Sequence, residues 1–362
     1  MTRMWFLGLV LAAGLLAAPA ALAQHGKVDS VTVHGSILEG NLLGASADRA
    51  VSIYLPFGYD EAGAARYPVA YLLHPLDGNI HSWWSASAYV GPDTVTVADE
   101  LIAAGTIQPL ILVMPDASTP YGACFYANSP VCGDWEDFIT EDLVAYVDAH
   151  YRTLARAGGR ALVGGDAGGY GALVLAMKHP DVFAVAYAMS PLNAALPEPA
   201  SSGVYSSDAF ALTAPDRAMG LSASSSLSRA QLAMAAVASP NPDHPPYYVD
   251  LPFVEVNGQM QERDAVWEAW VEHTPIHMLD RYRANLMSLR ALGLDVGTNE
   301  DVQDDVPGAR ALHEALVAAG IPHRFEVYAG SQRGMKSERM ASTVLPFVAA
   351  ALDGSLAAPT GP

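Results

Sequence analysis

The chain has 362 residues, of which 51% are hydrophobic and 16% are charged, and its formal net charge is −19. This length is enough for one large α/β domain or two small ones. Nucleic acids and anionic lipids bind basic surfaces, so such an acidic chain argues against both as partners and predicts a well-solvated protein.

Residues 1–23 are predicted to lie outside the folded domain. Arg3 supplies a positive start, residues 5–16 are apolar, and Ala21-Leu22-Ala23 has the small-x-small form of a cleavage site. This pattern is typical of a secretory signal peptide. A transmembrane anchor is the alternative, although the apolar core is short for a span and no stop-transfer segment follows. We therefore expect a periplasmic or secreted protein with no membrane span after cleavage.

Alternating strands and helices are predicted from residue 28 onward. The expected strands cover 28–38, 51–55, 67–74, 110–115, 160–165, 183–190, 292–296 and 324–329. The expected helices cover 95–104, 137–151, the segment after 166, 264–292, 309–319 and 341–352. The continuous apolar runs at 67–74 and 110–115 are typical of strands buried on both faces. This alternation predicts an α/β fold with a mostly parallel sheet and helices on both faces.

The domain organisation follows from the same pattern. We expect one α/β domain over 24–352 and a disordered tail over 353–362. The regular alternation stops after about the sixth strand, so 192–270 is interpreted as a loop-rich, cap-like excursion.

The two cysteines, Cys124 and Cys132, lie close together in the sequence. In an oxidising compartment such a pair favours one disulfide, and two buried free thiols are the alternative. No histidine lies beside them at ligand spacing, so we expect no zinc site there.

The most informative segment lies between the strand at 160–165 and the helix that follows. Gly164-Gly165-Asp166-Ala167-Gly168 has the form of a nucleophile elbow, G-x-S-x-G, with glycines at both required positions. Such a turn needs small neighbours because it pushes its central residue out over the end of the sheet. Here that residue is an aspartate, so a carboxylate replaces the hydroxyl.

Several further segments resemble one family. They are Tyr54-Leu-Pro-Phe-Gly-Tyr59, Tyr71-Leu-Leu-His74, Asn128-Ser-Pro, Trp135-Glu-Asp-Phe138, Gly168-Gly-Tyr-Gly-Ala-Leu173, Asp295-Val-Gly-Thr298 and Phe325-Glu-Val-Tyr-Ala-Gly330. Together they are similar to the esterase family of the α/β-hydrolase fold, which includes esterase D-like enzymes, feruloyl esterases and antigen 85 mycolyltransferases. The likeness extends from about Val51 to Leu352.

This resemblance implies a Ser-His-Asp triad that cleaves or transfers acyl esters at the carboxyl ends of the strands. Matched residue by residue, the nucleophile position is Asp166, the histidine position is Gln332 and the acid position is Glu300. The triad is therefore degenerate at two positions, while glutamate can still serve as the acid.

The resemblance also implies an oxyanion hole and a pocket. The oxyanion donors would be the backbone amides of Leu76 and Ala167. Pro75 stands where the family usually has glycine, and proline lacks an N–H and restricts the turn, so we expect an impaired hole. The predicted pocket residues are His74, Trp83 and Tyr126.

A pseudo-hydrolase is the main hypothesis. Losing nucleophile and base together removes on the order of 10⁶ in kcat in a well-studied hydrolase. The protein would then bind a small ester-like ligand or an envelope protein. One alternative is residual or rerouted ester hydrolysis or acyl transfer.

Two more hypotheses concern the carboxylates. Asp166 could be a nucleophile, as in haloalkane dehalogenases, although Gln332 cannot act as the base that hydrolyses the resulting ester. Asp166 and Glu300 could instead form a paired-carboxylate or metal site, but no regular ligand spacing accompanies them. We expect no cofactor and no metal.

Overall fold

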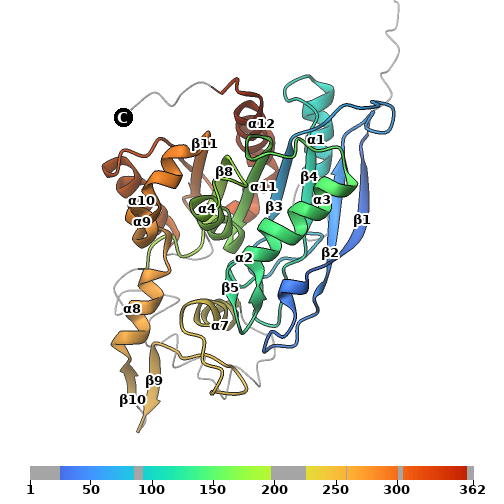
Figure 1. Cartoon of the computed structure of the whole chain (residues 1–362). Helices are drawn as coiled ribbons and strands as arrows, with labels where there is room; N and C mark the ends of the chain where they lie inside the picture. Colours follow the sequence, from blue (N-terminus) through green and yellow to red (C-terminus); the bar gives the residue numbers. More distant parts are fainter. Residues whose placement is uncertain (1–24, 85–92, 197–225, 258, 301–304, 357–362) are drawn as a thin grey trace, which may run out of the picture.

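The computed structural model describes residues 25–84, 93–196, 226–257, 259–300 and 305–356. Its centre is an eight-stranded sheet (Figure 1). In spatial order the strands are β1 (Lys27–His34), β2 (Asp48–Leu55), β4 (Ile111–Pro115), β3 (Val69–Leu73), β7 (Arg160–Asp166), β8 (Val185–Pro191), β11 (Ala291–Gly297) and β12 (Arg324–Tyr328).

Most neighbouring strands in this sheet are parallel. Only β2 runs antiparallel to its neighbours, β1 and β4, and the pairings from β4 to β12 are all parallel. The predicted mostly parallel sheet is confirmed. Its parallel strands therefore share one carboxyl edge.

Helices cover both faces of the sheet (Figure 1), as predicted. One face carries α2 (Trp135–Asp137), the π-helical η2 (Phe138–Leu143), α3 (Val144–His150), α4 (Ala167–Lys178), α9 (Pro275–Ser288) and α10 (Asp305–Ala318). The other carries α1 (Thr94–Ala103) and the consecutive segments α11 (Gln332–Arg339), η4 (Met340–Val344) and α12 (Leu345–Asp353).

The core lies on both sides of β3. Val69, Tyr71 and Leu73 pack into the cluster on one face, and Ala70 and Leu72 pack into the cluster on the other. All five are fully buried, as the continuous apolar run predicts.

The excursion after β8 contains regular structure, of which the sequence analysis predicted only the helix that begins at Asp264. Its described part has α7 (Ser226–Ala238), a hairpin of β9 (Phe253–Val256) and β10 (Gln259–Glu262), and α8 (Asp264–Glu272). Figure 1 shows the hairpin and α8 extending away from the main sheet. Shorter elements elsewhere are η1 (Ser36–Leu38), the paired β5 (Asn128–Ser129) and β6 (Gly133–Asp134), and η3 (Ala157–Gly159).

Two predicted elements have different bounds in the structure. The helix expected over 264–292 is divided into α8 and α9. A proline disfavours the helical conformation for the residue before it, and Thr274, which precedes Pro275, is extended with ψ 145°. The strand expected over 28–38 ends at His34 and is followed by a turn of 3-10 helix. Helix α11 was not predicted.

Some predictions fall outside the described residues. These are the signal peptide at 1–23, residues 197–225 of the excursion and residues 357–362 of the tail. Among the described helices, none is both long and apolar enough to cross a bilayer. Cys124 and Cys132 form a disulfide, so the prediction of a bonded pair is confirmed and the alternative of two free thiols is wrong.

Candidate active site

Asp166 lies in the sharp turn between β7 and α4, with φ 56° and ψ −121°, a conformation rare for residues with a side chain. The two glycines of the motif explain why the turn closes so tightly. A Cβ on Gly164 would lie 1.9 Å from the carbonyl oxygen of Gly168, and a Cβ on Gly168 would lie 2.1 Å from that of Leu73. Both positions therefore exclude any side chain.

The carboxylate of Asp166 binds both amides that were predicted as oxyanion donors. The Leu76 N–H donates to Oδ2 at 2.7 Å, and the backbone amide of Ala167 also bonds to the carboxylate. Burial raises the pKa of Asp166, and these two amides oppose that rise; the nearby charge of Asp77 raises the pKa and that of Arg333 lowers it. The carboxyl group of Asp166 thus occupies the space between the two amides that the sequence predicts as oxyanion donors.

Pro75 does not remove the donor on Leu76. The Pro75 carbonyl accepts from the Gly78 N–H at 2.8 Å, which closes the turn, and the Leu76 carbonyl accepts from the Ala123 N–H at 3.0 Å. The loop after β3 is therefore fixed on both sides of Leu76. Its N–H faces Asp166 although a proline precedes it.

His74 is buried beneath this loop and is neutral. Its Nδ1 lies 2.8 Å from the Pro75 carbonyl, and its Nε2 lies 2.8 Å from the Ala117 N–H. A carbonyl only accepts and an amide only donates, so the ring must carry its proton on Nδ1. Burial lowers the pKa of His74. Tyr126 is also buried and donates from its hydroxyl to the His74 carbonyl at 2.9 Å, so both residues support the loop from below.

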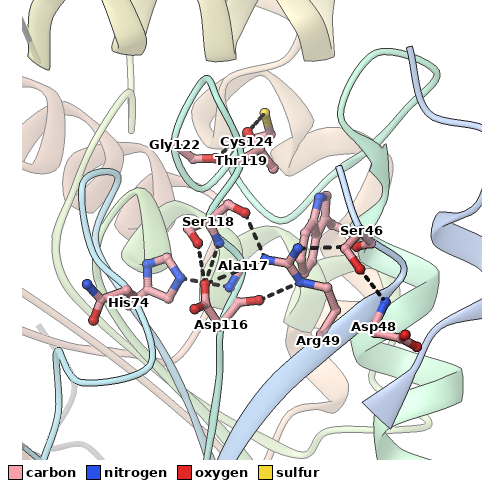
Figure 2. A network of polar contacts seen from close by, with 12 residues as sticks. Ser46, Asp48, Arg49, His74, Asp116, Ala117, Ser118, Thr119, Gly122 and Cys124 are labelled. Carbon is pink, nitrogen blue, oxygen red and sulfur yellow. Dashed lines mark hydrogen bonds and ion pairs between the residues drawn. The ribbon is translucent and has the colours of Figure 1, made fainter. Parts of the chain in front are cut away.

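A network around Arg49 holds the next loop against β2 (Figure 2). Arg49 donates to the carbonyl oxygens of Asp116 at 3.0 Å and Ser118 at 2.7 Å. Its guanidinium lies 4.9 Å from the centre of the Trp135 ring. Asp116 in turn accepts from the Ser118 N–H at 2.9 Å. The segment from Asp116 to Ala123, which contacts Leu76, is thereby rigidly positioned.

Trp83 packs in the core rather than in an open pocket. It is 1% exposed, and the ammonium of Lys336 lies 5.5 Å from the centre of its ring. Lys336 also donates to the Ser82 carbonyl, and burial lowers the pKa of the lysine to about 8. Helix α11 therefore anchors the loop that contains Trp83.

Glu300 and Gln332 are hydrogen-bonded to each other at the carboxyl edge of the sheet, where Asp166 also lies. Oε1 of Glu300 accepts from the Gln332 backbone N–H at 2.9 Å, the Ser190 hydroxyl at 2.5 Å and the Gly297 N–H at 2.8 Å. A Cβ on Gly165 would lie 2.3 Å from Nε2 of Gln332, so the glutamine amide packs on the residue before Asp166. The structure thus brings Asp166, Glu300 and Gln332 together.

No histidine in the described part of the chain is hydrogen-bonded to a serine hydroxyl or to Asp166. The nearest equivalent is Thr274, whose hydroxyl lies 2.9 Å from Nδ1 of His277. That hydroxyl also lies 2.7 Å from the Val271 carbonyl, to which it donates its proton. The described residues also contain no group of three or more His, Cys, Asp or Glu side chains able to hold a metal ion.

The fold and the elbow together define an α/β hydrolase: a mostly parallel sheet between two layers of helices, with a strained strand-to-helix turn at its carboxyl edge. Within this class the chain belongs to the esterase family described as "Putative esterase", which matches residues 45–337.

Two relatives are similar over part of the chain. An esterase of Mycobacterium tuberculosis is 33% identical over 141 residues, which cover 38% of this chain and 27% of that protein. The endo-1,4-beta-xylanase/feruloyl esterase of Xylanibacter ruminicola is 28% identical over 155 residues, which cover 41% of this chain and 21% of that protein. The match therefore spans about a quarter of the length of these relatives.

Solved structures share the fold along most of the chain. A ferulic acid esterase superposes with a TM-score of 0.62 at 21% identity, covering 91% of this chain and 98% of its own. The S-formylglutathione hydrolase from Agrobacterium tumefaciens superposes with a TM-score of 0.53 at 16% identity, covering 92% and 94%. At these identities the likeness shows the fold alone.

Proposed function

We propose that this protein is a non-hydrolytic member of the esterase family that binds a small ligand or a protein partner at its degenerate active site. One observation supports this most directly: the Leu76 N–H donates to Oδ2 of Asp166 at 2.7 Å. The nucleophile position therefore has no hydroxyl, and its carboxylate fills the oxyanion site.

The filled oxyanion site opposes ester chemistry. Oxyanion donors act by lying about 2.7–3.1 Å from the charge that develops in the transition state. Here the amides of Leu76 and Ala167 already bond to a fixed carboxylate. A second negative oxygen would meet like charge in place of free donors.

The site also lacks a base. A neutral amide does not accept a proton near pH 7, so Gln332 cannot replace an imidazole. Glu300 remains at the acid position, but its carboxylate holds the Gln332 backbone instead of a ring. His74 cannot substitute, because both ring nitrogens are engaged by backbone groups.

The same geometry disfavours aspartate chemistry. A nucleophilic carboxylate must attack with a free oxygen and then release the ester it forms with a histidine-activated water. Leu76 holds one Asp166 oxygen and leaves the other able to attack, but among the described residues no histidine is bonded to this site to activate the water. An alkyl ester on Asp166 would persist.

We also infer an extracytoplasmic location. The leader-like pattern at residues 1–23 and the disulfide between Cys124 and Cys132 both support it, because disulfides persist in oxidising compartments.

The test is hydrolysis of p-nitrophenyl acetate and butyrate by four proteins: the parent, Asp166→Ser, Gln332→His and the double variant. We expect the parent and both single variants near the buffer background, and measurable turnover in the double variant. Clear parental turnover would contradict the proposal. If Asp166→Ala abolished that turnover, it would establish aspartate chemistry; if turnover survived, another residue would be the nucleophile.

A further inference from the structure

We propose that Asp166 makes the elbow a binding site for a ligand with a positively charged, hydrogen-bond-donating nitrogen, of the primary alkylamine class. This inference rests on the proposed function, because it requires that the carboxylate bind a ligand rather than attack one. It names the chemistry of the ligand that the same site would take.

The first argument is the hydrogen-bonding capacity of the carboxylate. An ionised carboxylate offers about four acceptor positions, and it cannot donate. The amides of Leu76 and Ala167 each donate one hydrogen bond to Asp166. About two acceptor positions therefore remain for a ligand, and only a donor can fill them.

The second argument is which groups a ligand can reach. Leu76 and Ala167 are buried at 5% and 0% exposure, whereas Asp166 is only partly buried. Both amides are buried and already donate to Asp166, so they are not available to an acceptor group on a ligand. An ester carbonyl or a carboxylate offers only acceptors to this surface, while an alkylammonium offers three donors and the opposite charge. Charge-assisted hydrogen bonds of this kind are about twice as strong as neutral ones.

The third argument concerns the surrounding charges. Asp77, on the loop after β3, adds negative charge near Asp166, and its carboxylate is paired with Nε of Arg229 at 2.6 Å. Arg333, on α11, adds positive charge near Asp166 and opposes an amine, as does Arg229 on Asp77. The chain as a whole has a net charge of −19, which attracts cations at long range. The balance favours a cationic ligand.

The experiment compares three matched probes: n-butylammonium, 1-butanol and butanoate. Each is titrated by calorimetry into the full mature chain at pH 7.5 and low ionic strength. We expect the affinity to fall in the order butylammonium, butanol, butanoate. Lowering the pH should weaken butylammonium binding as the Asp166 carboxylate is protonated.

The key variant is Asp166→Asn, which keeps an acceptor for the Leu76 N–H but removes the charge. We expect it to bind butylammonium about tenfold or more weakly, the usual effect of losing a hydrogen bond to a charged group. Asp166→Ser should show the same loss and serves as a second variant if the first folds poorly. Asp60→Asn is the control: β2 runs antiparallel to β4, so the loop after β2 lies at the opposite edge of the sheet. Its affinity should equal that of the parent.

Equal butylammonium affinity in the parent and Asp166→Asn would overturn this inference, and so would butanoate binding as tightly as butylammonium. These results are distinct from a failure of the proposed function, which would appear as ester turnover by the parent. A parent that is inactive on esters and has no Asp166-dependent amine affinity would leave the proposed function standing and refute the amine site.

Discussion

Arg339 donates from both Nε and Nη2 to the same oxygen of Asp295, at 3.1 and 2.7 Å. It also binds Glu326 through two hydrogen bonds of 2.9 and 3.0 Å. Asp295 is fully buried at the end of β11, and burial raises its pKa to about 6 against the opposing effect of Arg339. Because α11 begins at Gln332 and ends at Arg339, this network fixes the helix that lines the candidate site.

Replacing Arg339 should therefore be costly. Arg339→Met leaves Asp295 buried without its cation, and breaking a buried pair in this way costs about 3–5 kcal/mol. Urea denaturation at pH 7.5 measures the loss. Arg324→Met is the matched control, because its 3.6 Å pair with Glu326 is exposed, and it should change the unfolding free energy by less than about 1 kcal/mol. A loss below about 1 kcal/mol in Arg339→Met would show that the network does not anchor α11.

The neutral His74 predicts a pH dependence of stability. Burial lowers its pKa from the usual value of 6.5. Between the folded-state pKa and 6.5, His74 is therefore protonated in the unfolded chain and neutral in the folded chain. The stabilisation is complete above pH 6.5 and is lost as the pH falls from there towards the folded-state pKa. His74→Gln should lack this loss. Urea denaturation at pH 7.5 and 5.5 tests it, with the exposed His150→Gln as a control that keeps the parental slope.

The elbow glycines should be intolerant of any side chain. A Cβ on Gly168 would meet a backbone carbonyl at 2.1 Å, so Gly168→Ala requires strand and helix to separate. We expect a loss of at least about 1–3 kcal/mol, the usual cost of overpacking. Gly308→Ala in α10, where the nearest atom lies at 3.3 Å, should stay within about 1 kcal/mol of the parent. Equal unfolding midpoints for the two variants would contradict the elbow geometry.

Removing the disulfide should destabilise the fold moderately. Cys124 and Cys132 are separated by 8 positions, and closing so short a loop gains about 2–3 kcal/mol on the chain-entropy argument. The double variant Cys124→Ala/Cys132→Ala should lose this amount in urea denaturation. Dithiothreitol should lower the stability of the parent by a similar amount and leave the double variant unchanged. A reductant effect on the double variant would show that dithiothreitol acts elsewhere.

The main sheet could be predicted because its central strands are buried on both faces. Runs such as 69–73 and 111–115 are apolar at every position. The glycines around Asp166 predict a tight turn. Helix α11 escaped prediction because its buried face is polar: Gln332, Lys336 and Arg339 all point inward. A search for apolar periodicity cannot find a helix held by hydrogen bonds and ion pairs.

The site residues were identifiable from the sequence, but their contacts were not. The sequence places a carboxylate at the elbow, yet only coordinates show that it reaches the Leu76 N–H. Pro75 signalled a damaged loop, whereas the turn closes through the carbonyl of that same proline. His74 and Trp83 were expected to line a pocket, and both are buried because backbone groups and Lys336 hold them. Such partners come from distant segments, which no local pattern encodes.

The hydrogen bond between Leu76 and Asp166 also bears on the Asp166→Ser variant. A residue at φ 56° stores strain of about 1–3 kcal/mol. The hydrogen bond from the Leu76 N–H to the Asp166 carboxylate offsets this strain. Serine has only one side-chain oxygen and would not make this hydrogen bond. Asp166→Ser would therefore loosen the turn, so we expect the turnover of the double variant to rise further once the loop after β3 is held in another way.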